Sequence, residues 1–280
     1  MGLASPGIHP HADVSPVAEL APDVTVGAFA IIEGKVRLGP GCVVRPRAHL
    51  IGPLVMGRDN HVFSNAIIGE RPQHLRYRGE PTGVRVGDGN VFRENVTVHR
   101  ATTASWETRI GDGNYFMSGA HVAHDCQIGD RCTLVNNALL GGHCTVADGA
   151  YVSGNAGVHQ FCRLGRLSLL SGCSLTTKDV PPFVIQQGVN SVVGVNVVGM
   201  RRAGLAAWQI DAVRRLYHVV FRQGLILPDA LDRVEEDYGE VDVVREFVAF
   251  VRASRRGINR KRMVGPSRTP QSPADACWVD

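Results

Sequence analysis

The sequence lacks several features that would assign it to a common class of protein. Its 280 residues include no apolar run long enough to span a bilayer, which argues against an integral membrane protein. The N-terminus, MGLASPGIHP, has neither the basic stretch nor the apolar core of an export signal, so we expect a cytoplasmic protein. Lys and Arg do not cluster among aromatic residues and the net charge is only +4, which gives no indication of nucleic-acid binding.

Cysteine usage and the scarcity of aromatic residues exclude two further classes. The seven cysteines are an odd number and form no CxxC pair, so we expect free thiols in a reducing compartment rather than a disulfide framework. Aromatic residues make up only 6% of the chain, whereas glycine is abundant at 32 residues. This balance favours many short strands joined by tight turns over long helices.

An aliphatic residue recurs at every sixth position over most of the chain. Eleven successive positions at this spacing, from Ile8 to Ile68, are apolar, and the same ladder runs from Ile110 to Leu170. A helix requires apolar residues three and four apart, and a strand alternates with period two, so a period of six fits neither. It fits a mainly β coil with three flat sides, in which each short strand contributes one inward aliphatic residue.

The stretch Met117–Cys126 holds the densest group of chemically active side chains on this ladder. Three hexads complete one turn, so residues 18 apart should stack in adjacent turns, about 4.8 Å apart. By this rule His124 lies beside Gly142, and Asp125 lies beside His143. An imidazole held by a carboxylate suits a general base, so we predict His124 as the base and Asp125 as the group that orients it. The backbone N–H of Gly142 is then a candidate donor to an oxyanion.

Other segments depart from the ladder and define the domains. Residues 70–84 and 99–108 interrupt the hexads without changing their phase, and we interpret both as loops extruded from the coil. Apolar spacing becomes helical towards the C-terminus. We therefore predict a β-helix over 1–190, a small helical domain over 191–259 and a disordered tail over 260–280. The many arginines of the helical segment form either a solvated face or a docking surface for an acidic partner.

Six segments are more distinctive than the hexads: IGERPQHLRYRGEPT (68–82), VTVHR (96–100), HVAHDC (121–126), LGGHCTV (140–146), GVHQF (157–161) and KDVPPFVIQQG (178–188). Together they resemble the acyl-carrier-protein:UDP-N-acetylglucosamine O-acyltransferases, the hexapeptide-repeat family that begins lipid A biosynthesis. The resemblance implies a left-handed parallel β-helix with a C-terminal helical domain, assembled as a homotrimer with its active cleft between subunits. It also implies transfer of a 3-hydroxy fatty acyl chain from acyl carrier protein to the 3-position of UDP-N-acetylglucosamine.

The resemblance also implies roles for individual residues. His124 matches the family's catalytic histidine, and Gly142 matches the glycine that donates to the oxyanion. From their place on the coil or from the resemblance, the residues expected to line the substrate site are Gln73, Arg76, His99, His121, His143, His159, Gln160, Gly172, Asn196 and Arg202. A glycine at position 172 leaves the acyl groove open, which predicts a long chain. No metal or other cofactor is expected, and the acyl-carrier-protein thioester is a co-substrate.

Three positions depart from the family pattern and keep alternatives open. His74 stands where an aspartate is usual, Val198 where a glutamate is usual, and Ala203 where a second arginine is usual. A UDP-sugar with an amine at position 3 is therefore a second candidate acceptor. An acetyl-CoA-dependent sugar acetyltransferase would share the base but would not need the basic helices. A zinc enzyme like the γ-class carbonic anhydrases would also use histidines on a β-helix, although the spacing of His121 and His124 does not suit its paired ligands.

Overall fold

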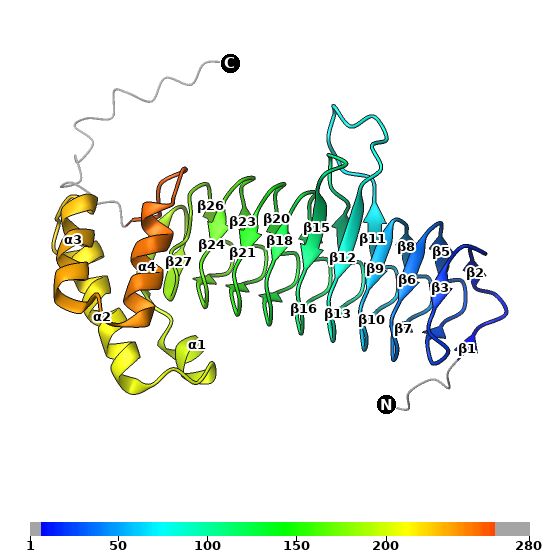
Figure 1. Ribbon diagram of the computed structural model, residues 1–280, viewed down its shortest axis with the longest axis horizontal. Helices are drawn as coiled ribbons and strands as arrows, with labels where there is room; N and C mark the ends of the chain where they lie inside the picture. Colours follow the sequence, from blue (N-terminus) through cyan, green and yellow to red (C-terminus); the bar gives the residue numbers. More distant parts are fainter. Residues whose placement is uncertain (1–6, 261–280) are drawn as a thin grey trace, which may run out of the picture.

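The computed structural model describes residues 7–260, which form a long three-sided coil of short strands with helices at its C-terminal end (Figure 1). Each turn adds one strand to each of three sheets, here called A, B and C. Within residues 7–260 these sheets contain 11, 9 and 8 strands. Residue Thr133 pairs with Tyr151 in the next turn, which confirms the predicted spacing of 18 residues. The mainly β solenoid is therefore as predicted, while its left hand stays a prediction.

The strands are short because each flat side of the coil holds only a few residues before the next corner. Sheet A consists of β1 (Gly7–Ile8), β4 (Thr25–Val26), β7 (Val43–Val44), β10 (His61–Val62), β13 (Val91–Phe92), β16 (Tyr115–Phe116), β19 (Thr133–Leu134), β22 (Tyr151–Val152), β25 (Leu169–Leu170), β27 (Val184–Gln187) and β28 (Ser191–Val195). Sheet B consists of β2 (Asp13–Val14), β5 (Ile31–Glu33), β8 (His49–Ile51), β11 (Ile67–Glu70), β14 (Thr97–His99), β17 (His121–Val122), β20 (Leu139–Leu140), β23 (Gly157–Val158) and β26 (Leu175–Thr176). Sheet C consists of β3 (Glu19–Leu20), β6 (Val36–Leu38), β9 (Leu54–Met56), β12 (Gly83–Val86), β15 (Glu107–Ile110), β18 (Gln127–Ile128), β21 (Thr145–Val146) and β24 (Arg163–Leu164).

The aliphatic ladder of the sequence is the core of the coil. Val122, Leu134 and Leu140 are fully buried, as the period of six predicts. In the middle of the coil Phe92 and Phe116 stack with their ring centroids 4.8 Å apart and their planes nearly parallel. Burial of this continuous apolar column is the main source of stability, at about 25 cal/mol per Å² of apolar surface.

The cysteines within residues 7–260 are free, and all except Cys173 are buried. The thiol of Cys126 donates to the carbonyl oxygen of Gly141 in the next turn, with an S–O distance of 3.3 Å. Burial raises the pKa of Cys132 to about 12. The buried cysteines are therefore small core side chains.

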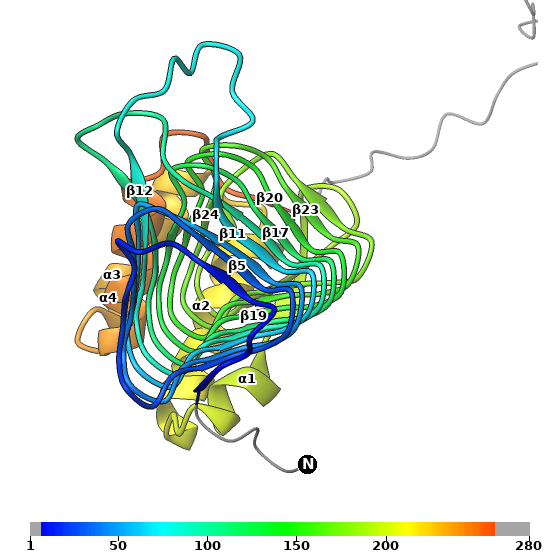
Figure 2. The ribbon, with the colours of Figure 1, turned by 90° about the vertical axis from the view of Figure 1, so that its right-hand side faces the viewer.

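The two loops leave the coil at the same corner, between sheets B and C, and stand side by side above it (Figure 2). Loop 71–82 joins β11 to β12, and loop 100–106 joins β14 to β15. The flanking strands reach further into both segments than the predicted limits 70–84 and 99–108. Both loops therefore lie over the edge of the coil that carries His124.

The C-terminal end corrects the predicted boundary at residue 191. Strand β28 lies within the segment predicted to be helical and runs antiparallel to β27. Gly188 and Asn190, with φ angles of +65° and +53°, adopt the left-handed conformation that lets the chain reverse here. The helices follow as α1 (Val197–Arg202), α2 (Ala207–Arg222), α3 (Leu227–Tyr238) and α4 (Asp242–Arg252).

The helices are fixed to the last turns of the coil. The guanidinium of Arg166 binds the carboxylate of Glu246 in α4, with N–O distances of 2.7 to 3.0 Å. Arg163 donates to the carbonyl oxygen of Phe250 at 2.7 Å. No helix within residues 7–260 has the length and apolar character needed to cross a membrane. The tail predicted over 260–280 lies outside the described residues except for Arg260.

Candidate active site

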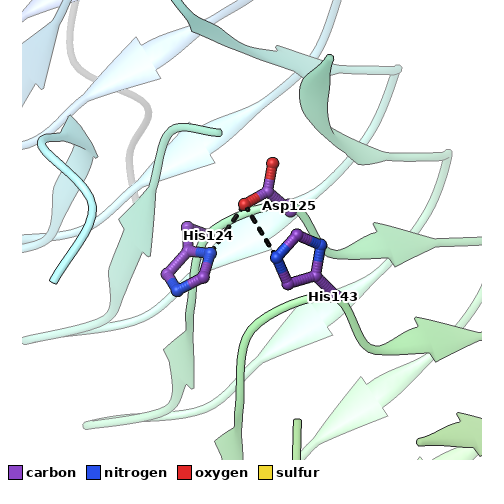
Figure 3. Close-up of side chains that lie close together, drawn as sticks. All are labelled: His124, Asp125 and His143. Carbon is purple, nitrogen blue, oxygen red and sulfur yellow. Dashed lines mark hydrogen bonds and ion pairs between the residues drawn. The ribbon is translucent and has the colours of Figure 1, made fainter. Parts of the chain in front are cut away.

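The site is built at the corner where sheet B passes into sheet C. His124 and Asp125 lie two and three residues after the end of β17, and the φ angle of +63° at Asp125 turns the chain through the corner. The next turn stacks on this one, because the backbone N–H of His143 donates to the carbonyl oxygen of His124 at 2.9 Å. The hexad period therefore brings His124, Asp125 and His143 together, as Figure 3 shows.

His124 and Asp125 form a buried hydrogen-bonded pair. The Nδ1 atom of His124 lies 2.6 Å from the Oδ2 atom of Asp125, and the two residues are 7% and 2% exposed. An ionised carboxylate can only accept, so Nδ1 carries the proton of the neutral imidazole. The Nε2 atom is thereby left with a free lone pair, which is the state required of a general base.

Asp125 is held in its ionised form by its hydrogen bonds. Burial acts to raise the pKa of this carboxyl group, but hydrogen bonds from His124 and Thr102 outweigh it and hold the pKa below its ordinary value. The backbone N–H of Thr102 donates to Oδ1 at 3.1 Å, and its hydroxyl donates to Oδ2 at 2.8 Å. The carboxylate is therefore negative and fixed on the side of His124 that faces away from Nε2.

Gly142 lies directly against the imidazole of His124. A methyl group at position 142 would come within 2.5 Å of Cε1 and 2.8 Å of Nε2, so only glycine allows the ring to lie here. Among residues 7–260 no protein group accepts the backbone N–H of Gly142. A free N–H beside an unprotonated Nε2 is the arrangement needed to hold an oxyanion while a proton is taken.

Three more histidines of the sequence prediction lie on the same edge. The ring of His143 stacks on Phe161 at a centroid distance of 4.6 Å, and its Nε2 atom is 3.4 Å from Oδ2 of Asp125. His99 and His121 contact each other edge to face at 5.3 Å. Burial lowers the pKa of His121 to about 4 and also lowers the pKa of His99 and of His143. The edge therefore presents neutral imidazoles, which can both donate and accept.

Loop 71–82 closes the site from one side. The imidazole of His74 meets that of His124 edge to face, with 5.2 Å between ring centroids. The loop is attached to the coil because Nδ1 of His99 donates to the carbonyl oxygen of Arg71 at 2.6 Å. Gln73 and Arg76 lie on this loop with exposed side chains. They are available to a ligand, although no hydrogen bond links them to His124 within residues 7–260.

The remaining predicted residues lie apart from His124 within one chain. His159 and Gln160 are exposed at the same corner two turns further along. Gly172 is exposed at a different corner, between sheets A and B, and a methyl group there would meet only the carbonyl oxygen of Gly154, at 3.6 Å. The single chain therefore does not gather all the predicted substrate residues around its own base.

Asn196 and Arg202 line a separate cavity of about 510 Å³, together with Tyr151, Leu167 and Val198 among others. This cavity lies over sheet A and the corner between sheets C and A. The side chain of Asn196 is already used by the protein, because it donates to the carbonyl oxygen of Leu167 at 2.8 Å and accepts from the N–H of Gly199 at 2.9 Å. Asn196 caps α1 and thereby shapes the cavity wall, while the guanidinium of Arg202 is exposed.

The residues that could hold a metal ion are the same three that form the site. Ligand atoms of His124, Asp125 and His143 lie within 4.8 Å of one another. However, Nδ1 of His124 is hydrogen-bonded to Asp125, and the carboxylate of Asp125 already accepts from Thr102. A metal ion would have to displace these hydrogen bonds, so the geometry suits a histidine–carboxylate pair better than a metal centre.

Sequence reasoning missed the residues that hold Asp125. Thr102 and Thr108 both bind it from the extruded segment, through the carboxylate and through the backbone N–H respectively. Threonine is common in loops, so a threonine there does not by itself indicate a functional residue. The one available signal was that loop 100–106 leaves the coil one turn before His124.

Two family models match the chain. One, described as Udp N-acetylglucosamine O-acyltransferase, Domain 2, matches residues 179–259, and the bacterial transferase hexapeptide repeat matches residues 107–142. Among solved structures, the UDP-N-acetylglucosamine acyltransferase of Francisella novicida superposes with a TM-score of 0.88 at 34% identity, over 92% of this chain and 95% of that one. The corresponding protein of Bacteroides fragilis 9343 gives 0.87 at 34% identity, over 89% and 98%.

Curated relatives are similar over most of the chain. An acyl-acyl-carrier-protein–UDP-N-acetylglucosamine O-acyltransferase from Halorhodospira halophila is 43% identical over 255 residues, which cover 90% of this chain and 99% of the relative. Its counterpart from Anaeromyxobacter sp. (strain Fw109-5) is 45% identical over 213 residues, which cover 75% and 83%. The chain therefore belongs to the family of acyl-acyl-carrier-protein–UDP-N-acetylglucosamine O-acyltransferases.

Proposed function

We propose that this protein transfers an acyl chain from the thioester of acyl carrier protein to the 3-hydroxyl of UDP-N-acetylglucosamine, as the first step of lipid A biosynthesis. The observation that carries the proposal is the pairing of His124 with Asp125 beside the free N–H of Gly142. Family membership supplies the donor and the acceptor.

Each group has one role in the reaction. Nε2 of His124 takes the proton of the sugar hydroxyl as its oxygen attacks the thioester carbonyl, and Asp125 stabilises the imidazolium that forms. The N–H of Gly142 donates to the oxyanion of the tetrahedral intermediate. When the intermediate collapses, the C–S bond breaks and the imidazolium returns its proton to the departing thiolate. The products are the acylated sugar nucleotide and the free thiol of acyl carrier protein.

The acceptor side is assigned to the neutral histidines on the coil edge. His99, His121 and His143 offer uncharged donors and acceptors to sugar hydroxyls, while Gln73, Arg76, His159 and Gln160 are exposed around them. His74, which contacts His124, would meet the same sugar. A glycine at position 172 would leave an acyl groove open, so we expect a long 3-hydroxy acyl chain. A product profile that peaks at a medium chain length would contradict this.

The active form is proposed to be a homotrimer. Sheet B carries outward apolar side chains, of which Ile31, Leu139 and Leu175 are 40%, 49% and 46% exposed. They alternate with polar residues such as His49, Thr97 and His121, and we propose that another subunit covers this mixed face. A neighbouring subunit would bring the cavity of Asn196 and Arg202 to the corner of His124. Light scattering should give three times the mass of the 30.2 kDa chain, and a monomer would contradict the shared site.

A panel of substrates tests the proposal. The purified protein is offered UDP-N-acetylglucosamine or its 3-amino analogue, with acyl-carrier-protein thioesters or acetyl-CoA as donor, and the products are identified by mass. We expect acylated UDP-N-acetylglucosamine from the carrier-protein thioester and little from acetyl-CoA. Product formed only with the 3-amino sugar would move the acceptor assignment to that sugar, as His74 and Val198 allow. Product formed equally well from acetyl-CoA would contradict the donor assignment.

A further inference from the structure

Residues 102–108 contact every polar group of Asp125, and His124 contacts its Oδ2 atom. The backbone N–H of Thr102 donates to Oδ1 at 3.1 Å, and the hydroxyl of Thr102 donates to Oδ2 at 2.8 Å. Thr108 accepts the backbone N–H of Asp125 at 2.8 Å, and the indole N–H of Trp106 lies 3.4 Å from its carbonyl oxygen. The loop and the strand that follows it thus hold both the backbone and the carboxylate of one residue.

Two imidazoles compete for this carboxylate. Oδ2 of Asp125 is 2.6 Å from Nδ1 of His124 and 3.4 Å from Nε2 of His143 (Figure 3). Both imidazoles are therefore close to the same carboxylate oxygen. The only other side-chain donor to Oδ2 within residues 7–260 is the hydroxyl of Thr102. The backbone N–H of Thr102 contacts both carboxylate oxygens, whereas its hydroxyl contacts only Oδ2, the oxygen that lies near both histidines.

We infer that Thr102 is a positioning residue, which holds the carboxylate of Asp125 on His124 and away from His143. The inference rests on the proposed function, in which His124 is the base. A threonine suits this task because its hydroxyl and N–H are neutral donors that keep their protons at any physiological pH. They fix the carboxylate without cancelling its charge, so the whole charge remains available to the imidazolium.

The test uses Thr102→Val, which keeps the shape of the side chain and removes only the hydroxyl. We expect kcat to fall roughly 10- to 100-fold, the effect of one hydrogen bond to a charged group, with the KM for UDP-N-acetylglucosamine little changed. Thr102→Ser, which restores the hydroxyl, should recover most of kcat. Thr103→Val is the matched control, because Thr103 is exposed on the same loop and its hydroxyl makes no hydrogen bond within residues 7–260.

A double-mutant cycle separates positioning from a general loosening of the loop. With His143→Ala in the background, the carboxylate has no second partner, so Thr102→Val should lower kcat much less than it does in the wild-type protein. An equal fall in both backgrounds would overturn the inference. So would wild-type kcat in Thr102→Val.

The hydrogen bond between His124 and Asp125 can also be observed by NMR, in the absence of catalysis. The proton between Nδ1 of His124 and Asp125 should give a low-field NMR resonance that is absent from His124→Ala. We expect Thr102→Val to shift or broaden this resonance and Thr103→Val to leave it unchanged, and an unchanged resonance in Thr102→Val would overturn the inference. If the wild-type protein showed the resonance but no acyl transfer, the proposed function would fail while this positioning would stand.

Discussion

At the scale of single residues, the corner at His124 depends on an atom that is absent. Gly142 has no Cβ, and the imidazole of His124 occupies the space that a Cβ would fill. The stacking of residues 18 apart predicts this contact, because the period of the coil fixes which side chains share a corner. Thr102 could not be predicted in the same way, since its loop leaves the coil and obeys no period.

Gly142→Ala should displace the imidazole of His124, because the new methyl group would lie 2.5 Å from Cε1. A shift of about 1 Å at a catalytic group costs roughly 100-fold in rate, so kcat should fall by about that factor. Gly194→Ala is the control, since a methyl group there would meet no atom within 4 Å. Normal kcat in Gly142→Ala would show that the base does not need its present position.

The neutral state of His121 predicts how stability depends on pH. Burial lowers its pKa from 6.5 to about 4, so between these values the unfolded chain binds more protons than the folded chain. The free energy of unfolding should therefore decrease as the pH is lowered from 6.5 towards 4. His121→Gln should flatten this part of the profile in urea titrations, and an unaltered slope would contradict the assignment to His121.

At the scale of elements, the hexads determine the three sheets and their inward ladder almost completely. The period fixes the register because a shift by one residue would turn every aliphatic side chain of a strand outward. The hexad period does not predict strand β28, because this strand is antiparallel and follows the chain reversal at Gly188 and Asn190. Helix α1 lies inside the segment predicted to be helical, although its six residues are too few for a helical period to be evident.

Phe116→Ala tests the contribution of the core at the middle of the coil. Phe116 is fully buried and stacks on Phe92 in the neighbouring turn. Its truncation should leave a cavity and lower the free energy of unfolding by about 3–5 kcal/mol, measured by urea titration. Val17→Ala is the surface control, because Val17 is 56% exposed and should change stability by less than about 0.5 kcal/mol. Similar effects of the two substitutions would contradict the ladder as the core.

At the scale of the whole molecule, the coil separates groups that the proposed reaction would need together. The base lies at the corner between sheets B and C, whereas the cavity of Asn196 and Arg202 lies at sheet A. The hexads place His124 on its corner, whereas Asn196 and Arg202 lie beyond the hexads and were assigned to the site from the resemblance alone. The sequence could not predict which corner contacts another subunit, because the outward-facing residues show no regular pattern.

The most direct test of His124 as the base is a single-turnover comparison of the wild-type protein with His124→Ala. Acyl-carrier-protein thioester and UDP-N-acetylglucosamine are mixed with excess enzyme, and binding of the sugar nucleotide is measured separately. Loss of positioned acid–base catalysis should lower the rate of acyl transfer by about 10² to 10⁴, while binding of UDP-N-acetylglucosamine survives in part. Acyl transfer by His124→Ala at a rate near that of the wild-type protein would contradict the assignment of His124 as the general base.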